Sequence, residues 1–186
     1  MRVLVACEFS GIVRDAFIAR GHDAWSCDII PTERPGPHII NDVRNILDDN
    51  WDMMIAHPPC THLSYAGQRW FKTDTDRWRR AKLDFDFFMR MINAPIPMIA
   101  VENTRGYTWQ WYKHPDQIVH PYEFGHNVTK ATCLWLKQLP PLMVTLVHAD
   151  PFVNWTTYQG SHNGKARSRT FTGIAQAMAN QWGHSR

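Results

Sequence analysis

The sequence predicts a single α/β domain with a mostly parallel central sheet and helices on both faces. Short apolar runs rich in Val, Ile and Ala recur along the chain, as in strands that are buried on both faces. Segments with helical spacing separate several of these runs. Acidic, cysteine and asparagine residues follow the ends of the runs. Parallel sheets bind their ligands beyond these ends, so we expect the functional site there.

Each element follows from its local pattern. The first strand is expected at 2–7 and ends in the turn Glu8–Gly11, after which apolar spacing predicts a helix over 12–20 that stops at Gly21. The other expected strands and extended segments are 24–29, 39–40, 51–56, 98–101, 117–124 and 131–136. The other expected helices are 76–93, where apolar residues repeat every three or four positions, and 173–182. This order favours right-handed crossovers between parallel strands.

The size and composition limit the possible functions. A length of 186 residues fits one domain, 1–186, with a first half at 1–56 and a second part at 57–186. No apolar run approaches the roughly 20 residues that span a bilayer, and the apolar N-terminus lacks the basic region of a targeting signal. The four cysteines are scattered, which favours reduced thiols in the cytoplasm. The net charge of +3 permits a nucleic-acid partner without requiring one.

The first half carries the pattern of a nucleotide site. Gly11 opens the first helix, and Asp28 follows the second strand, as acidic residues that hold a ribose often do. Asp28 is suited to accept the two ribose hydroxyls, and Asp42 is suited to accept the amino group of an adenine. Both residues fit equally well as turn or helix-capping residues.

The second half carries two motifs that can form a reaction site. His57-Pro58-Pro59-Cys60 follows the strand 51–56, and Glu102-Asn103 follows the strand 98–101. Cys60 is either a nucleophile or an inert buried thiol. His57, Cys60 and His62 do not form a complete tetrahedral metal site, because no second Cys or His pair accompanies them. We therefore expect no metal.

Together, these motifs resemble the cytosine-carbon-5 DNA methyltransferases. The loops at Phe9–Gly11, Pro58–Cys60 and Glu102–Asn103 carry the likeness, which extends from about Val3 to Asn103 and continues weakly at Arg169–Gly173. The chain as a whole looks like the compact methyltransferases of bacteriophages and prophages that lack a clear target-recognition domain. The resemblance implies a Rossmann-like fold that binds S-adenosyl-L-methionine and methylates DNA.

The resemblance also implies roles for individual residues. The implied catalytic residues are Cys60, Glu102 and Asn103. The implied cofactor-binding residues are Glu8, Phe9, Ser10, Gly11, Asp28, Ile29, Asp42, Val43, His57 and Pro58. The expected substrate-binding residues are Ser64, Lys130, Thr132, Lys165, Arg167 and Arg169, of which Lys165, Arg167 and Arg169 form a basic run suited to phosphates.

The implied chemistry explains the residue types. A thiolate that adds to carbon 6 of cytosine makes carbon 5 nucleophilic, and we expect a lowered pKa for Cys60 beside backbone amides and a cationic cofactor. Glu102 is assigned to ring nitrogen 3 as a carboxyl group whose pKa is raised by burial. Asn103 is expected to hold the loop, and the two prolines to stiffen the backbone of Cys60.

Three departures from the family leave the substrate open. Val13 stands where the family has a second glycine, the Gln-x-Arg-x-Arg motif is missing, and the interval 137–168 is short for a lobe that reads DNA. The substrate is therefore duplex DNA, single-stranded DNA or a free cytosine nucleotide. Further phosphate contacts are possible at Arg69, Lys72, Arg79 and Arg80, although the charges of 77–82 also fit a solvated helix face. The rival functions are a catalytically silent nucleotide-binding or nucleic-acid-binding protein, and another nucleotide-modifying enzyme altered at Glu8.

Overall fold

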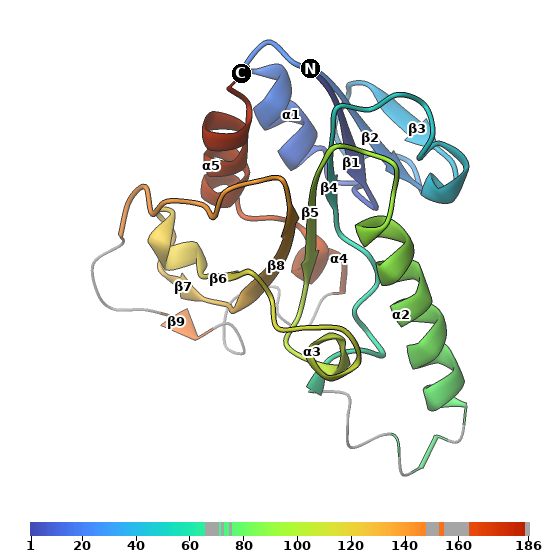
Figure 1. Cartoon of the computed structure of the whole chain (residues 1–186). Coiled ribbons are helices and arrows are strands. Elements are labelled where there is room, and N and C mark those ends of the chain that lie inside the picture. Colours follow the sequence, from blue (N-terminus) through green and yellow to red (C-terminus); the bar gives the residue numbers. More distant parts are fainter. Residues whose placement is uncertain (66–70, 72, 75, 148–152, 155–163, 185–186) are drawn as a thin grey trace.

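The protein is a doubly wound α/β domain with a seven-stranded central sheet in the order β3-β2-β1-β4-β5-β8-β6 (Figure 1). The computed structural model describes residues 1–65, 71, 73–74, 76–147, 153–154 and 164–184. The strands of this sheet are β1 (Arg2–Ala6), β2 (Asp23–Asp28), β3 (His38–Ile40), β4 (Met53–Ala56), β5 (Met98–Asn103), β6 (Gln117–Val119) and β8 (Thr132–Lys137). A separate pair joins β7 (Val128–Thr129) to β9 (Val153–Asn154).

The helices are α1 (Ile12–Ile18), α2 (Arg77–Ile92), α3 (Tyr107–Trp111), α4 (Gly164–Ser168) and α5 (Thr172–Trp182), with short 3-10 turns η1 (Val43–Asn45) and η3 (Pro121–Glu123). Three of the helices, α1, α2 and α5, agree closely with the predicted ones, whereas the sequence does not predict α3 and α4. Within the described ranges, none of these helices has both the length and the apolar character needed to cross a bilayer.

Most neighbouring strands run parallel, as the sequence predicts. β1 pairs in parallel with β2 and β4, and β4 pairs in parallel with β5. β8 is the exception, because it pairs antiparallel with both β5 and β6. β6 and β8 are joined without a crossover helix, and an antiparallel pair needs none. The sheet is therefore mostly parallel with one reversed strand near its edge.

Alternate residues of the central strands divide the core into two layers. Val3 and Val5 of β1 pack with α1 and α5 on one face, whereas Leu4 and Ala6 pack with α2 on the other. Figure 1 shows α1 and α5 side by side on one face of the sheet and α2 on the opposite face. Because both faces are covered, the strands read as continuous apolar runs rather than alternating ones.

One charged residue of α2 departs from the predicted solvated face. Arg77 is buried, because its guanidinium donates a hydrogen bond of 3.0 Å to the carbonyl oxygen of Thr61 and lies 5.1 Å from the centre of the Phe71 ring. Arg79 and Arg80 remain on the exposed side, where they pair with Asp76 and Asp74 respectively. The start of α2 is therefore tied to the segment that follows β4.

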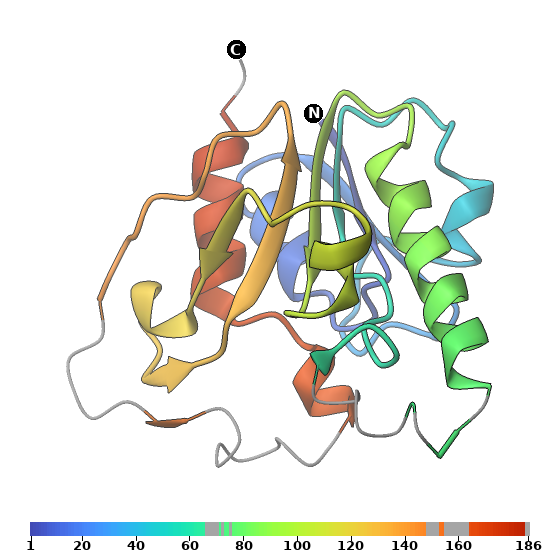
Figure 2. The same ribbon diagram turned by 60° about the horizontal axis from the view of Figure 1, so that its bottom comes forward.

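The strand order changes direction between β1 and β4. From β1 the chain winds outward to β2 and β3, and from β4 it winds the other way to β5. In sheets of this kind, the loops that leave the two central strands diverge at such a point, and ligands bind beyond the carboxyl edge there. Figure 2 brings this edge forward and shows α4 beside the segment that follows β4. The predicted site residues lie at this edge.

Candidate active site at the carboxyl edge of the sheet

The ends of β4 and β5 bring the two second-half motifs together. Ala56 is paired with Val101, so His57 and Glu102 leave the sheet as neighbours. Nδ1 of His57 lies 3.3 Å from Oε2 of Glu102, and the amide of Asn103 donates a hydrogen bond of 3.3 Å to the carbonyl oxygen of Pro58. Asn103 is buried, so this bond fixes the loop that carries Cys60. Asn103 thus contacts the loop, and its catalytic role stays a prediction.

The Cys60 loop is a compact turn that backbone hydrogen bonds hold in place. The carbonyl oxygen of Cys60 accepts hydrogen bonds of 3.1 Å from the backbone N–H groups of Leu63 and Ser64. The N–H of Tyr107 donates 2.8 Å to the carbonyl oxygen of Leu63, and Ser64 pairs with Gly106 in an isolated β-bridge. Ser64 therefore has a structural position in this turn.

A second set of contacts fixes the loop from α2. Nδ1 of His62 lies 2.8 Å from Oδ2 of Asp84, and Arg77 binds the carbonyl oxygen of Thr61. Both partners belong to one helix, which holds the segment after Cys60 against the body of the domain. Sequence reasoning missed Arg77 and Asp84, because neither lies in a motif and their contacts depend on the position of α2.

The pKa of the Cys60 thiol is raised, whereas the resemblance implies a lowered one. The surrounding atoms reduce the hydration of the thiolate although the residue reaches solvent, and the negative charge of Glu102 adds to the effect. Lys130 and Arg167 act in the opposite direction. The thiol therefore needs positive charge around it before it can serve as a nucleophile.

The expected raised pKa of Glu102 is wrong. Desolvation does act to raise it, but the hydrogen bond from His57 and the positive charge of Lys130 together outweigh this effect, so the pKa is lowered. The side chain of Glu102 is 25% exposed. Glu102 therefore stands in the site as a carboxylate, and any proton that it delivers must come from a neighbour.

Two basic residues from distant parts of the chain approach this pair. Lys130, which precedes β8, donates a hydrogen bond of 3.1 Å from Nζ to the carbonyl oxygen of Arg167 in α4. Both cations lower the pKa of Cys60. Thr132 is buried at the start of β8, and its hydroxyl donates 3.4 Å to the carbonyl oxygen of Lys130. Thr132 thus helps to fix the backbone of Lys130.

The basic run of α4 does not form one clamp. Nζ of Lys165 lies 5.7 Å from the centre of the Phe9 ring, and Arg167 faces Cys60. Arg169 is held by Glu33 through two hydrogen bonds of 2.8 Å. The three side chains therefore reach three different loops. Arg69 and Lys72 lie outside the described residues.

The turn after β1 is held by its own carboxylate. Glu8 is buried and accepts hydrogen bonds from the N–H groups of Val13 (2.7 Å) and Arg14 (3.2 Å), and from the hydroxyl of Ser10 (3.1 Å). These bonds satisfy donors that a helix leaves free at its start. Gly11 has φ of 71°, a left-handed conformation that suits glycine. Glu8 is thus occupied in shaping the turn that also carries Phe9.

Arg14 is a further residue that sequence reasoning missed. It is fully buried, and its guanidinium donates to the hydroxyls of Ser26 and Thr32 and to the carbonyl oxygens of Arg34 and Pro35. A Cβ at Gly11 would lie 2.5 Å from this guanidinium, which explains the glycine there. Arg14 occupies the position after Val13, and it holds the loop between β2 and β3 against α1.

Asp28 and Asp42 lie close to the end of β1, and each makes the local bond of a turn or cap. Asp28 accepts 3.2 Å from the N–H of Ile30, and Asp42 accepts 3.0 Å from the N–H of Arg44 and forms an ion pair with it. Both carboxylates raise the pKa of the buried thiol of Cys27, to about 11, although burial is the larger cause. Ile29 is 75% exposed and Val43 is buried. The two carboxylates therefore converge as predicted, and their ligand roles remain predictions.

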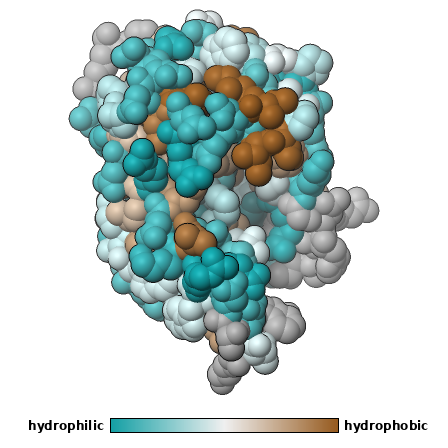
Figure 3. Space-filling model, turned by 90° about the vertical axis from the view of Figure 1, so that its right-hand side faces the viewer, coloured by the Kyte–Doolittle hydropathy of each residue, from teal (hydrophilic) through white to brown (hydrophobic). Residues whose placement is uncertain are grey.

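The face that carries β3 and α2 is largely hydrophilic (Figure 3). Hydrophobic areas are confined to a few places on this face. At the carboxyl edge of β2 and β3, the large exposed apolar side chains are Ile29 and Ile40. An exposed isoleucine directly after Asp28 is a surface that the planar ring of a ligand can cover.

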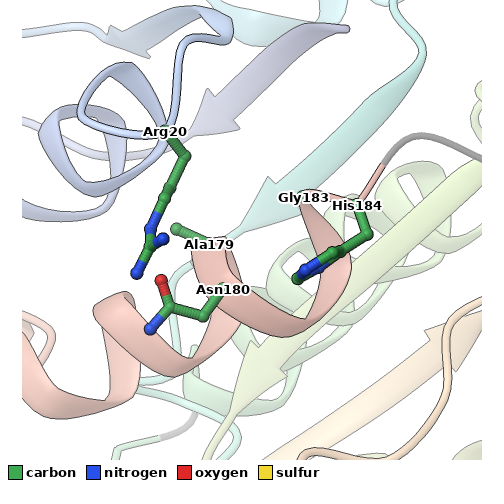
Figure 4. Close-up of a pocket in the computed structure, with 5 residues that line it drawn as sticks. All are labelled: Arg20, Ala179, Asn180, Gly183 and His184. Atoms are coloured by element: carbon green, nitrogen blue, oxygen red, sulfur yellow. The ribbon is translucent and has the colours of Figure 1, made fainter.

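Two surface hollows lie along α1 and α5, and the larger of them reaches Ile12 and Thr172 at the starts of these helices. One, of about 280 Å³, is lined by Arg20, Ala179, Asn180, Gly183 and His184 (Figure 4), and the other, of about 520 Å³, includes Asp15 and Gln176. Neither hollow is lined by a predicted site residue. Among the described residues, no group of three or more His, Cys, Asp or Glu side chains is placed to hold a metal ion.

Comparisons with known proteins find similarity only among solved structures. No protein family model matches this chain, and no curated protein does. A DNA modification methyltransferase encoded within an E. coli prophage matches with 16% identity and a TM-score of 0.48, over 84% of this chain and 53% of that one. The S. pombe Dnmt2 methyltransferase matches with 14% identity and a TM-score of 0.47, over 83% of this chain and 52% of that one. The chain thus spans about half the length of these structures. These likenesses are distant.

Proposed function

We propose that the protein transfers a methyl group from S-adenosyl-L-methionine to carbon 5 of cytosine in DNA, through a covalent adduct with Cys60. The observation that supports this most directly is the convergence of Cys60, Glu102 and Asn103 at the ends of β4 and β5. A nucleophilic thiol beside a carboxylate has no use in a protein that only binds nucleotides. It fits an enzyme that activates a pyrimidine ring by adding to it.

Each residue of the candidate site has a separate role in the proposed reaction. The Cys60 thiol loses its proton to water at the exposed rim, and Lys130 and Arg167 stabilise the thiolate that attacks carbon 6. Glu102 is positioned to mediate protonation of ring nitrogen 3, which neutralises the charge that the attack places on the ring. After methylation, water at the exposed rim takes the proton from carbon 5, and the electron pair of the broken C–H bond expels Cys60 as thiolate. Asn103 keeps the loop fixed through Pro58 during these steps.

The first half of the chain has residues that fit the cofactor. Oδ1 of Asp28 accepts a hydrogen bond from the N–H of Ile30. The second carboxylate oxygen, Oδ2, is suited to accept hydrogen bonds from ribose hydroxyls. The exposed side chain of Ile29 suits the face of an adenine. Phe9, Ser10, Gly11, Asp42, Val43 and Pro58 line the ends of the same strands. The bound cofactor would supply an electrophilic methyl group on a sulfonium.

The substrate contacts are proposed for the basic residues around Cys60. Lys130 and Arg167 suit a phosphate of the target strand, since both already influence the thiol electrostatically. Lys165 extends this positive surface towards Phe9. Arg169 is assigned instead to joining the end of α4 to the loop between β2 and β3, because Glu33 binds its guanidinium through two hydrogen bonds.

The decisive experiment uses a DNA strand that contains 5-fluorocytosine, with methyl-labelled S-adenosyl-L-methionine. Fluorine at carbon 5 cannot leave as a cation, so a covalent protein–DNA adduct should accumulate and carry the label. Cys60→Ala should abolish the adduct, and Glu102→Gln should slow its formation about 10²- to 10⁴-fold. Binding of S-adenosylhomocysteine without label transfer to any cytosine substrate would instead identify a catalytically silent binding protein.

A further inference from the structure

His57, at the junction of β4 and β5, contacts Glu102, and the proposed reaction gives this contact no role so far. The side chain of His57 is only 9% exposed, and its Nδ1 lies 3.3 Å from Oε2 of Glu102. Its other ring nitrogen, Nε2, is buried and has no hydrogen-bond partner among the described residues. A buried polar nitrogen without a hydrogen bond lowers the stability of the folded protein. An imidazole at this position therefore needs a functional explanation.

Glu102 by itself cannot supply the proton that the proposed reaction needs. The lowered pKa of Glu102 leaves it ionised at neutral pH, so it has no proton of its own for ring nitrogen 3. His57 is the described residue that shares a hydrogen bond with it. An imidazole can carry a second proton near neutral pH and give it up again, which few other side chains do.

We infer that His57 stores the proton that Glu102 passes to the substrate base, so that the two residues act as a relay. This inference rests on the proposed cytosine chemistry. The Nδ1–H bond of protonated His57 breaks, and its electron pair stays on Nδ1. Oε2 of Glu102 takes the proton and hands it to ring nitrogen 3 as Cys60 adds to carbon 6. When Cys60 leaves, the proton returns along the same atoms. His57 is thus a positioning residue that acts through Glu102.

The charged and titratable groups around Glu102 come from several elements. His57 and Cys60 follow β4, Lys130 precedes β8, and Cys133 lies on β8. The positive charge of Arg167 in α4 acts on Cys60. Lys130 and Arg167 stabilise anions and supply no proton in this scheme, and Cys133 is a buried thiol whose pKa is raised to about 12. Among the described residues, His57 is therefore the group placed to give Glu102 a proton.

The relay predicts a specific pH dependence for adduct formation. The rate rises with pH as Cys60 loses its proton, and it falls again as the His57–Glu102 pair loses its proton. His57→Asn keeps a hydrogen-bond donor near the position of Nδ1 but cannot store a proton. In that variant, we expect the rate at neutral pH to fall about 10²-fold and the descending limb to move to lower pH.

The test measures the rate of adduct formation with a 5-fluorocytosine single strand from about pH 5 to about pH 9. His62→Asn is the matched control, because His62 forms a similar pair with Asp84 in the same loop. The His62→Asn variant can form the adduct at a different rate, because the loop can shift, but the pH dependence of that rate should stay as in the wild type. His57→Gln replaces His57→Asn if circular dichroism shows that the latter does not fold.

A second measurement separates proton transfer from positioning. His57→Ala should be rescued by added imidazoles, and the rescued rate should depend on the pKa of the imidazole added. If His57→Asn retains the wild-type rate and pH profile, or if rescue is independent of that pKa, the relay is overturned while the proposed function stands. If the wild-type protein forms no adduct at all, the proposed function and the relay fall together.

Discussion

At the scale of the residue, Cys60 lies between opposing charges. Glu102 raises the pKa of its thiol, and Lys130 and Arg167 lower it. Loss of hydration is the larger cause of the raised pKa. Electrostatic interactions are stronger where water is partly excluded, so a change at either neighbour should reach the thiol. The reactivity of Cys60 is therefore a direct readout of whether these side chains share one site.

Glu102→Gln and Lys130→Gln should shift the reactivity of Cys60 in opposite directions. Removing the carboxylate lowers the pKa of Cys60, so its alkylation by iodoacetamide at about pH 8 should become about two- to tenfold faster. Removing the lysine charge should slow it. Mass spectrometry after timed labelling measures both rates. Cys27 and Cys133, which are buried, serve as internal controls that label only on unfolding. Shifts of the same sign would mean that the three residues are not neighbours.

The convergence of these residues could be predicted from sequence, but their ionisation could not. Cys60 and Glu102 follow neighbouring parallel strands, and strand ends of this kind meet at one edge. The pKa of Glu102 depends instead on Nδ1 of His57 and on Lys130, which approaches from a distant part of the chain. Glu8 likewise lies in the predicted turn, yet the free N–H groups of α1 occupy its carboxylate.

At the scale of the element, most strands and the longer helices could be predicted, whereas the shortest helices could not. The boundaries of β1, α2 and α5 lie within one or two residues of their expected positions. α3 and α4 have five residues each, too few for apolar periodicity to show, and they depend on tertiary contacts. The reversed direction of β8 also escapes sequence reasoning, because an apolar run has the same pattern in either direction.

The Cys60 loop and α3 form one unit, joined where Gly106 meets Leu63. A Cβ at Gly106 would lie 1.8 Å from the carbonyl oxygen of Leu63, and backbone on both sides prevents an easy adjustment. The φ of Gly106 is 174°, an extended conformation open to any residue, so the cost of a side chain here is purely steric. The fit between loop and helix therefore depends on this glycine.

Gly106→Ala should destabilise the protein by about 1 to 3 kcal/mol, because the loop and α3 must move apart. For a domain of this size, the melting temperature should fall by about 2 to 4 °C per kcal/mol, as measured by differential scanning calorimetry. Ser64→Ala is the control on the opposite side of the bridge. It keeps the backbone pairing and should change stability by no more than about 0.5 kcal/mol. An unchanged melting temperature for Gly106→Ala would contradict the close approach.

At the scale of the whole molecule, the candidate site lies at the carboxyl edge of the sheet, and within the described ranges few elements beside it could contact duplex DNA. The interval between β8 and α4 covers residues 138–163, which is short for a separate lobe that enters the major groove. The net charge of +3 gives only a modest general attraction for phosphates. Extracting a base from a duplex costs a few kcal/mol, which enzymes recover through extra contacts to the DNA. Among the residues that the structure describes, few elements beside the site are available for such contacts.

We therefore expect the protein to act on unpaired cytosine in preference to paired cytosine. Each 1.4 kcal/mol of unrecovered unpairing energy costs a factor of ten, so adduct formation should be at least about tenfold faster on a single strand than on the same sequence in a duplex. A duplex with one 5-fluorocytosine in an unpaired bubble separates unpairing from general strand binding. Its rate should approach that of the single strand, because the base is already free to enter the site. Equal rates on the intact duplex and the bubble would instead require that residues of this chain recover the cost of flipping.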